Sequence, residues 1–163
     1  MTQQQESQSV ITDEMRAAVG KESEPATLEV DKTGCRMFAR AVGHTDLIFY
    51  DEDYAKSKGY RSIVAPPGFL GTRTFKPVAG AAGQARPGLG FSIPYKRVLN
   101  GGTEVEYLDA VCAGDVLTAR NKITAFNERS GSMGPMLITN RDTTFTNQDG
   151  KVVAIERGTV IQY

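Results

Sequence analysis

The sequence predicts an α+β protein in which a curved antiparallel sheet wraps around a central helix, and three observations lead to this prediction. The best helical pattern covers residues 31–42, in the N-terminal half of the chain. Most of the chain after Asn100 alternates between apolar and polar residues, as strands with one buried face do. Asp149-Gly150 joins the last two alternating segments with a sequence typical of a two-residue hairpin turn.

Two short elements are expected before the central helix. Residues 12–19 have a helical pattern with Thr12 or Asp13 as the N-cap, and Gly20 ends it. Residues 26–30 alternate between apolar and polar side chains, which predicts a strand.

The central helix is predicted over residues 31–42, with Asp31 as its N-cap and Gly43 at its C-terminal end. A second helix over residues 51–58 begins with three acidic residues near its positive end and stops at Gly59. Apolar residues recur at helical spacing on one face of the central helix: Val30, Cys35, Phe38, Ala39 and Val42.

The strands of the second half are predicted from alternation and turn residues. They cover residues 103–107, 116–126, 136–146 and 152–163, and a turn at Ala113-Gly-Asp115 precedes the second of them. In the strand over residues 116–126, one face is expected to carry Leu117, Ala119, Ile123 and Ala125.

The length and the composition predict one domain over residues 10–163, preceded by a disordered polar lead over residues 1–9. A chain of 163 residues is long enough for one well-packed core and short for two. The lead is rich in glutamine and lacks the apolar stretch of a secretory signal. Residues 79–90, which are rich in Gly, Pro and Ala, are interpreted as a loop or linker.

The composition argues against several classes of function. Nineteen basic and nineteen acidic residues balance without a block of like charge, so neither nucleic acid nor a membrane surface is the expected partner. No apolar run approaches the ~20 residues that span a bilayer. One histidine and the separated Cys35 and Cys112 leave no pattern for a metal site. Two buried thiols are typical of a reducing compartment, so a cytoplasmic protein is expected.

Residues Phe38–Asp51 and the segment Ile63–Leu70 (Ile-Val-Ala-Pro-Pro-Gly-Phe-Leu) resemble the MaoC-like hydratases and dehydratases, in their N-terminal-type dehydratase domain. Further similarity lies at Val105–Tyr107, Ala113–Asp115 and Gln148–Ala154. The resemblance implies the hotdog fold, a curved sheet wrapped around a helix. It also implies addition of water to enoyl thioesters, or its removal from 3-hydroxyacyl thioesters, with no cofactor and with coenzyme A or acyl carrier protein as the thioester carrier.

The catalytic residues of the resembled family are replaced in this chain. Catalytic members read Gly-Asp-x-Asn-Pro-(apolar)-His after the helix, and the Asp and His hold the reacting water. Here Gly43–Phe49 reads Gly-His-Thr-Asp-Leu-Ile-Phe, which places His44 at the Asp position and Phe49 at the His position. Because phenylalanine cannot exchange a proton, the resemblance implies a non-catalytic, substrate-shaping subunit.

Alternatives to this interpretation remain. In a self-sufficient homodimeric hydratase, His44 would act as the base and Asp46 as its orienting partner. Otherwise His44 binds carbonyls at the helix end, and Asp46 is a turn or cap residue. The chain could instead be a non-catalytic module that binds an acyl thioester or another small molecule. A hotdog thioesterase would need a carboxylate on the central helix, which offers Asp31 at its start.

The resemblance also implies a substrate-binding set. Phe49 and Tyr50 are candidates to line an acyl tunnel, although they are most simply core and rim aromatics. In the family, backbone N–H groups at the second segment stabilise the enolate-like thioester carbonyl. Pro66 and Pro67 have no N–H, so Gly68 and Phe69 carry the candidate amides, with Pro67 next to them.

The expected partners are an acyl thioester and a second hotdog chain. Some dehydratases of the resembled family are heterodimers in which one half has lost the catalytic pair. The resemblance therefore implies a homodimer, or a heterodimer with a catalytic MaoC-like subunit. Pairing of this kind also covers the open edge of an antiparallel sheet.

Overall fold

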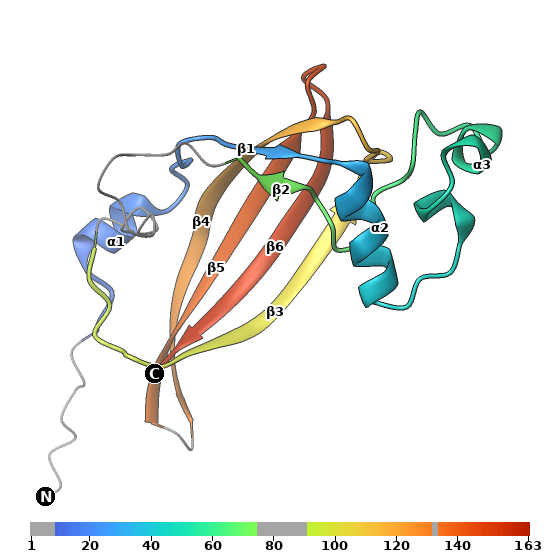
Figure 1. Cartoon of the computed structure of the whole chain (residues 1–163). Coiled ribbons are helices and arrows are strands. Elements are labelled where there is room, and N and C mark those ends of the chain that lie inside the picture. Colours follow the sequence, from blue (N-terminus) through green and yellow to red (C-terminus); the bar gives the residue numbers. More distant parts are fainter. Residues whose placement is uncertain (1–8, 75–90, 132–133) are drawn as a thin grey trace, which may run out of the picture.

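A computed structural model describes residues 9–74, 91–131 and 134–163, and its main feature is a curved six-stranded antiparallel sheet (Figure 1). The strand order is β2-β1-β4-β5-β6-β3, so the short strands β2 and β1 lie at one side and β3 forms the opposite edge. The strands are β1 (Ala26–Glu29), β2 (Thr72–Arg73), β3 (Val98–Tyr107), β4 (Val116–Gly131), β5 (Gly134–Thr146) and β6 (Val152–Gln162).

Within the described ranges, three α-helices and one 3-10 helix accompany the sheet. They are α1 (Asp13–Ala18), α2 (Lys32–Ala41), η1 (Leu47–Phe49) and α3 (Glu52–Ser57). Helices α1 and α2 begin at their predicted caps, whereas Asp51, predicted as the first residue of its helix, is the N-cap of α3. The side chains of Thr12, Asp31 and Asp51 accept backbone hydrogen bonds at the three N-termini. Gly43 and Gly59 have positive φ angles just after α2 and α3, as the predicted C-terminal glycines should.

The largest apolar cluster joins α2 and the segment before β2 to one end of the sheet. Figure 1 shows α2 and α3 on one side of the strands and α1 on the other. Cys35 is the contribution of α2 to a cluster that also contains Val30, Ile63, Ala65, Leu70, Val111, Ala113, Leu117, Ala119, Phe145, Val153 and Ala154. The α+β architecture with a helix packed on a curved sheet is therefore confirmed.

Two details of the predicted burial are wrong. Val42, expected on the buried face of the helix, is 52% exposed because α2 ends at Ala41 and the chain turns away there. Ala125 was expected beside Ile123 on one face, but a β-bulge lies between them. Ile123 pairs with Arg141 whereas Ala125 pairs with the adjacent residue Asn140, so the two side chains face opposite sides of the sheet.

The predicted loop over residues 79–90 lies outside the described residues. The same is true of the predicted lead over residues 1–9, except for Ser9, whose hydroxyl donates a hydrogen bond of 3.1 Å to Glu128. Among the helices that the structure describes, none is long and apolar enough to cross a membrane.

Candidate functional site

The loop that follows α2 brings His44, Phe49 and Tyr50 together. The rings of His44 and Phe49 lie 5.1 Å apart at an angle of 42°. Phe49 is only 8% exposed, and His44 is half-buried. The Tyr50 hydroxyl donates a hydrogen bond of 2.6 Å to the backbone carbonyl of His44, which closes the loop on itself. The imidazole of His44 is therefore packed against a side chain that cannot exchange a proton with it.

Asp46 lies in the same loop but makes a different contact. Its Oδ1 atom accepts a hydrogen bond of 3.0 Å from the backbone N–H of Ile48, and Asp46 is thereby the N-cap of η1. No hydrogen bond joins Asp46 to His44. The local sequence explains this arrangement, since an Asp with extended backbone angles before a helical turn is a favoured cap. In this geometry the carboxylate does not orient the imidazole.

The second predicted segment forms a tight turn in which both candidate amides already have partners. The N–H of Gly68 donates a hydrogen bond of 2.7 Å to the Tyr107 hydroxyl. The N–H of Phe69 donates one of 2.9 Å to the carbonyl of Pro66. Pro67 and Gly68 are exposed on the turn. The amide of Gly68 becomes available to a ligand when the Tyr107 side chain moves, whereas that of Phe69 is fixed by the turn itself.

Helix α2 positions this turn through three close contacts. The Phe38 and Phe69 rings lie 5.6 Å apart. A Cβ atom on Gly34 would lie 2.7 Å from Cζ of Phe69, and one on Gly68 would lie 3.2 Å from Cζ of Phe38. Gly68 also has a φ of +93°, which side chains other than glycine rarely adopt. Both glycines are therefore required for the helix and the turn to approach this closely.

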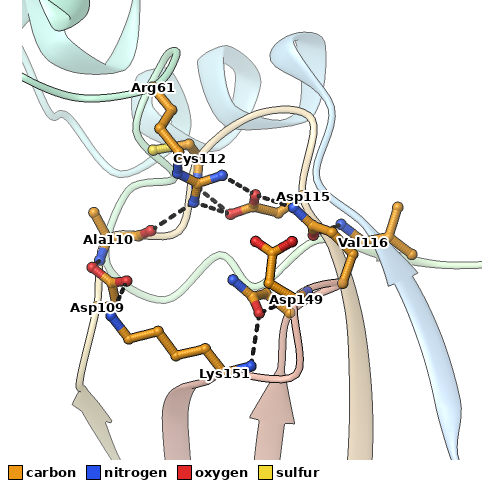
Figure 2. Close-up of polar contacts among 10 residues, drawn as sticks. Arg61, Asp109, Ala110, Cys112, Asp115, Val116, Asp149 and Lys151 are labelled. Carbon is orange, nitrogen blue, oxygen red and sulfur yellow. Dashed lines mark hydrogen bonds and ion pairs between the residues drawn. The ribbon is translucent and has the colours of Figure 1, made fainter.

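An ion pair between a buried carboxylate and an exposed arginine, which the sequence pattern did not indicate, anchors the segment that leads into the turn (Figure 2). The Arg61 guanidinium donates two hydrogen bonds, of 2.6 and 3.0 Å, to the carboxylate of Asp115. Asp115 is 1% exposed and also accepts a hydrogen bond of 2.9 Å from the Cys112 N–H. The Gln148 amide approaches the same carboxylate at 3.4 Å. This pair connects residues that are 54 positions apart.

The protonation state of Asp115 follows from these contacts. Burial by itself raises the pKa of this carboxyl, but the hydrogen bonds that it accepts, above all from Arg61, lower the pKa below its ordinary value. Nearby backbone bonds join Ala113 to Ile63 and Ala65 to Val111. The ion pair therefore fixes the strand-like segment that immediately precedes Pro66, and its role is to position the turn.

Among the described residues, two cavities on the sheet stand out, and the predicted site residues line neither of them. One, of about 590 Å³, is lined by residues around the bulges of β3 and β4. The other, of about 750 Å³, lies between α1, β2 and the strands β4 and β5. Within the described part of the chain, no three His, Cys, Asp or Glu side chains cluster as metal ligands would. Burial raises the pKa of the Cys35 thiol to about 11, so this residue is a poor nucleophile.

Sequence comparison shows which family this chain matches. A profile of the family described as FAS1-like, dehydratase domain region, matches residues 17–156. A UPF0336 protein of Streptomyces coelicolor is 35% identical over 118 residues, which cover 72% of this chain and 76% of the relative. A UPF0336 protein of Streptomyces avermitilis is 36% identical over 104 residues, with 64% and 67% coverage.

Solved structures share the fold. The ChsH1-ChsH2 complex of Mycobacterium tuberculosis contains a chain with a TM-score of 0.72 at 19% identity, covering 92% of this chain and 87% of the other. The C-terminally truncated HadBC complex, a 3R-hydroxyacyl-ACP dehydratase of the same organism, gives a TM-score of 0.68 at 24% identity, with 88% and 96% coverage. A MaoC-like dehydratase gives 0.67 at 20% identity, with 90% and 42% coverage. The predicted hotdog fold is confirmed.

Proposed function

We propose, from the premise that this chain belongs to the family of FAS1-like dehydratase-region proteins with a MaoC-like hotdog fold, that it is the non-catalytic, substrate-shaping subunit of a hydro-lyase. The reaction of the complete enzyme is hydration of an enoyl thioester or dehydration of a 3-hydroxyacyl thioester. The observation that carries the proposal is Phe49, which is buried against His44 where the resembled family has its histidine.

The chemistry requires an acid and a base beside one water molecule. A hydration moves one proton from the water and delivers one to the α-carbon of the thioester. Phe49 offers neither function, and Asp46 is occupied as a helix cap. These contacts also weigh against the alternative in which His44 and Asp46 form a catalytic pair.

The hydrogen bonds of the Gly68 and Phe69 amides also support a non-catalytic role. A thioester carbonyl becomes enolate-like during the reaction and needs N–H donors aimed at it. The Gly68 and Phe69 amides both have acceptors within the chain. A substrate carbonyl would have to displace the Tyr107 hydroxyl before it could use even one of them. This supports binding of the reacting carbonyl by another chain.

The free edge of the sheet is a suitable place for that chain. Strand β3 is ten residues long, and in the part of the chain that the structure describes it pairs with β6 alone. Val98 is 62% exposed and Leu99 is 44% exposed on this edge strand. An unpaired strand with apolar side chains is a template for pairing with a second chain. The ChsH1-ChsH2 and HadBC structures are complexes of different proteins, which is consistent with a hetero-oligomer.

The substrate is an acyl thioester of coenzyme A or acyl carrier protein, and the contribution of this chain is space for the acyl group. Helix α2 has ten residues and covers one end of the sheet. The cavity of about 750 Å³ lies further along the sheet, between α1, β2, β4 and β5. A cavity of this size is typical of small-molecule sites.

Reconstitution tests the proposal. A catalytically active MaoC-like chain is assayed for enoyl-CoA hydration alone and after assembly with this protein. The proposal predicts that assembly raises turnover of enoyl-CoA esters with long acyl groups and leaves crotonyl-CoA nearly unchanged. Assembly without any change in acyl preference would contradict the substrate-shaping role. Thioester binding without assembly would favour the alternative of a binding module.

A further inference from the structure

The cavity of about 750 Å³ has a polar floor, which is unexpected for a compartment that receives a plain hydrocarbon. Its floor is made by β4 and β5. Ala119 and Ile123 supply buried apolar surface, and Asn121, Thr143 and Arg141 lie among them.

The register of the strands places these polar side chains on the same face. Asn121 pairs with Thr143, and Ile123 pairs with Arg141, so the side chains of each pair face the same side of the sheet. The Asn121 amide donates a hydrogen bond of 3.0 Å to the Thr143 hydroxyl, which confirms the arrangement. The polar groups are therefore a continuous part of the floor.

The Arg141 side chain packs against a glycine, and Arg141 lines both cavities. Gly158, its pairing partner on β6, is buried, and a Cβ atom there would lie 3.1 Å from Nε and 3.4 Å from Cγ of Arg141. The side chain of Arg141 thus lies across the space that the missing Cβ leaves. Arg141 is exposed, and any residue with a Cβ atom at position 158 would shift its side chain.

Arg141 and Arg73, which also lines the cavity, have no carboxylate within ion-pair distance in the described ranges. By contrast, Arg61 binds Asp115, Arg120 lies 3.9 Å from Glu22, and Arg157 binds Glu106. The carboxylates that also line this cavity are on the α1 side: Glu14, Glu22 and Glu24. Glu156 pairs with Thr143 and faces the same side of the sheet.

Asn121 and Thr143 already bond each other, but a plain alkyl chain in this cavity would remove water from Arg141 without replacing its hydrogen bonds. Such a chain should therefore bind more weakly than one with a polar end. A carboxylate replaces the lost hydrogen bonds, because a guanidinium binds it through two parallel hydrogen bonds. Short methylene segments would still contact Ala119 and Ile123. The floor therefore matches a ligand that is partly apolar and ends in an acid.

We propose that this cavity binds an acyl group whose distal end carries a carboxylate, with Arg141 and Arg73 as the residues that bind it. The assignment to an acyl thioester rests on the proposed function, and this inference narrows its substrate class to thioesters of dicarboxylic acids.

Direct binding to the purified protein tests the site without any partner or turnover. Hexanoate and hexanamide have the same carbon chain and differ in charge, and calorimetry or NMR titration measures their affinities. Hexanoate is expected to bind at least tenfold more tightly than hexanamide. Equal binding of the two, or no binding of hexanoate, would overturn the proposal.

Two variants and a control locate the site. Arg141→Gln is expected to weaken hexanoate binding at least tenfold. Gly158→Ala keeps every charge but displaces the Arg141 side chain, so it should weaken binding several-fold. Arg129→Gln removes an exposed arginine of β4 that does not line the cavity and should change nothing. Circular dichroism verifies folding of each variant, and unchanged affinity in folded Arg141→Gln would overturn the assignment.

The failures of the two proposals are distinguishable. The protein could bind hexanoate and also hydrate enoyl-CoA on its own. That result would support the assignment of the cavity and refute the non-catalytic role. Conversely, assembly with a catalytic chain could alter acyl preference although the protein binds hexanoate and hexanamide equally. That result would support the subunit role and refute the proposal that the substrate is a dicarboxylic thioester.

Discussion

The Tyr107 hydroxyl accepts a hydrogen bond of 2.7 Å from the backbone N–H of Gly68, which joins the end of the edge strand to the turn against α2. Tyr107 is 38% exposed, so its side chain has room to leave. The same residue therefore lies on the strand that we propose pairs with a partner and at the amide that a carbonyl would need. If a partner pairs along β3 as we propose, assembly and exposure of the Gly68 amide would be coupled through this contact.

Tyr107→Phe should release the Gly68 amide. The hydrogen bond is lost and the N–H becomes open to water, so its hydrogen exchange should accelerate at least tenfold. Stability should fall by about 0.5–1.5 kcal/mol, the usual net value of one hydrogen bond. Exchange measured by NMR tests this, with Tyr54→Phe on α3 as the control. Unchanged exchange at Gly68 would show that Tyr107 does not protect it.

Removal of the buried carboxylate should destabilise the protein. Asp115→Ala leaves the Cys112 N–H without its acceptor and deprives Arg61 of its partner. The Arg61 side chain is 53% exposed and can be hydrated, so the loss should be about 2 kcal/mol, below that of a fully buried pair. Urea unfolding measures it, and Asp149→Ala, at an exposed turn, should cost far less. Equal effects of the two variants would contradict the anchoring role.

The same carboxylate should contribute to the loss of stability in acid. The pKa of Asp115 is lower in the folded chain than its ordinary value of 3.8. The unfolded state therefore binds the proton more readily, and the stabilisation is fully present above about pH 4. It is lost as the pH falls through the folded-state pKa. The urea midpoint of the wild type should thus fall more steeply below pH 4 than that of Asp115→Asn, and parallel curves would contradict this.

Charge on the free edge should prevent assembly. Leu99→Asp places a carboxylate on an exposed position of β3, where a pairing strand would bury it. Association with a second chain should weaken at least tenfold, while the stability of the isolated protein changes by no more than about 0.5 kcal/mol. Analytical ultracentrifugation measures the association. Val116→Asp, at an exposed position of β4, is the control, and equal effects of both variants would argue against β3 as the interface.

Local patterns were sufficient to predict the three α-helices and the presence of the four long strands. Strand β3, however, begins at Val98, before its predicted start at residue 103, and β2 was not predicted. Caps such as Asp31 and Asp51 and the glycines after α2 and α3 act within a few residues, so the sequence alone reveals them. The bulge between Ile123 and Ala125 depends on how β4 meets β5, and simple alternation cannot locate it. The exposure of Val42 depends on the direction that the chain takes after α2.

Only part of the candidate site could be predicted from the sequence, for a similar reason. The sequence identified His44, Asp46 and Phe49 as one loop, but the capping bond of Asp46 depends on the short helix η1, which the pattern did not indicate. The contact between Gly68 and Tyr107 spans 39 positions, and that between Arg61 and Asp115 spans 54. Contacts of this range depend on the tertiary fold, and the roles of His44 and the substrate-binding residues stay predictions.

Enoyl-thioester hydration by the pure protein tests the central claim most directly. Crotonyl-CoA and a longer-chain enoyl-CoA are supplied to the wild type and to His44→Ala, with folding verified in both. The account predicts no turnover by either protein, because Phe49 cannot take the place of the catalytic histidine. Robust turnover by the wild type that is lost in His44→Ala would contradict it and would make His44 a working base.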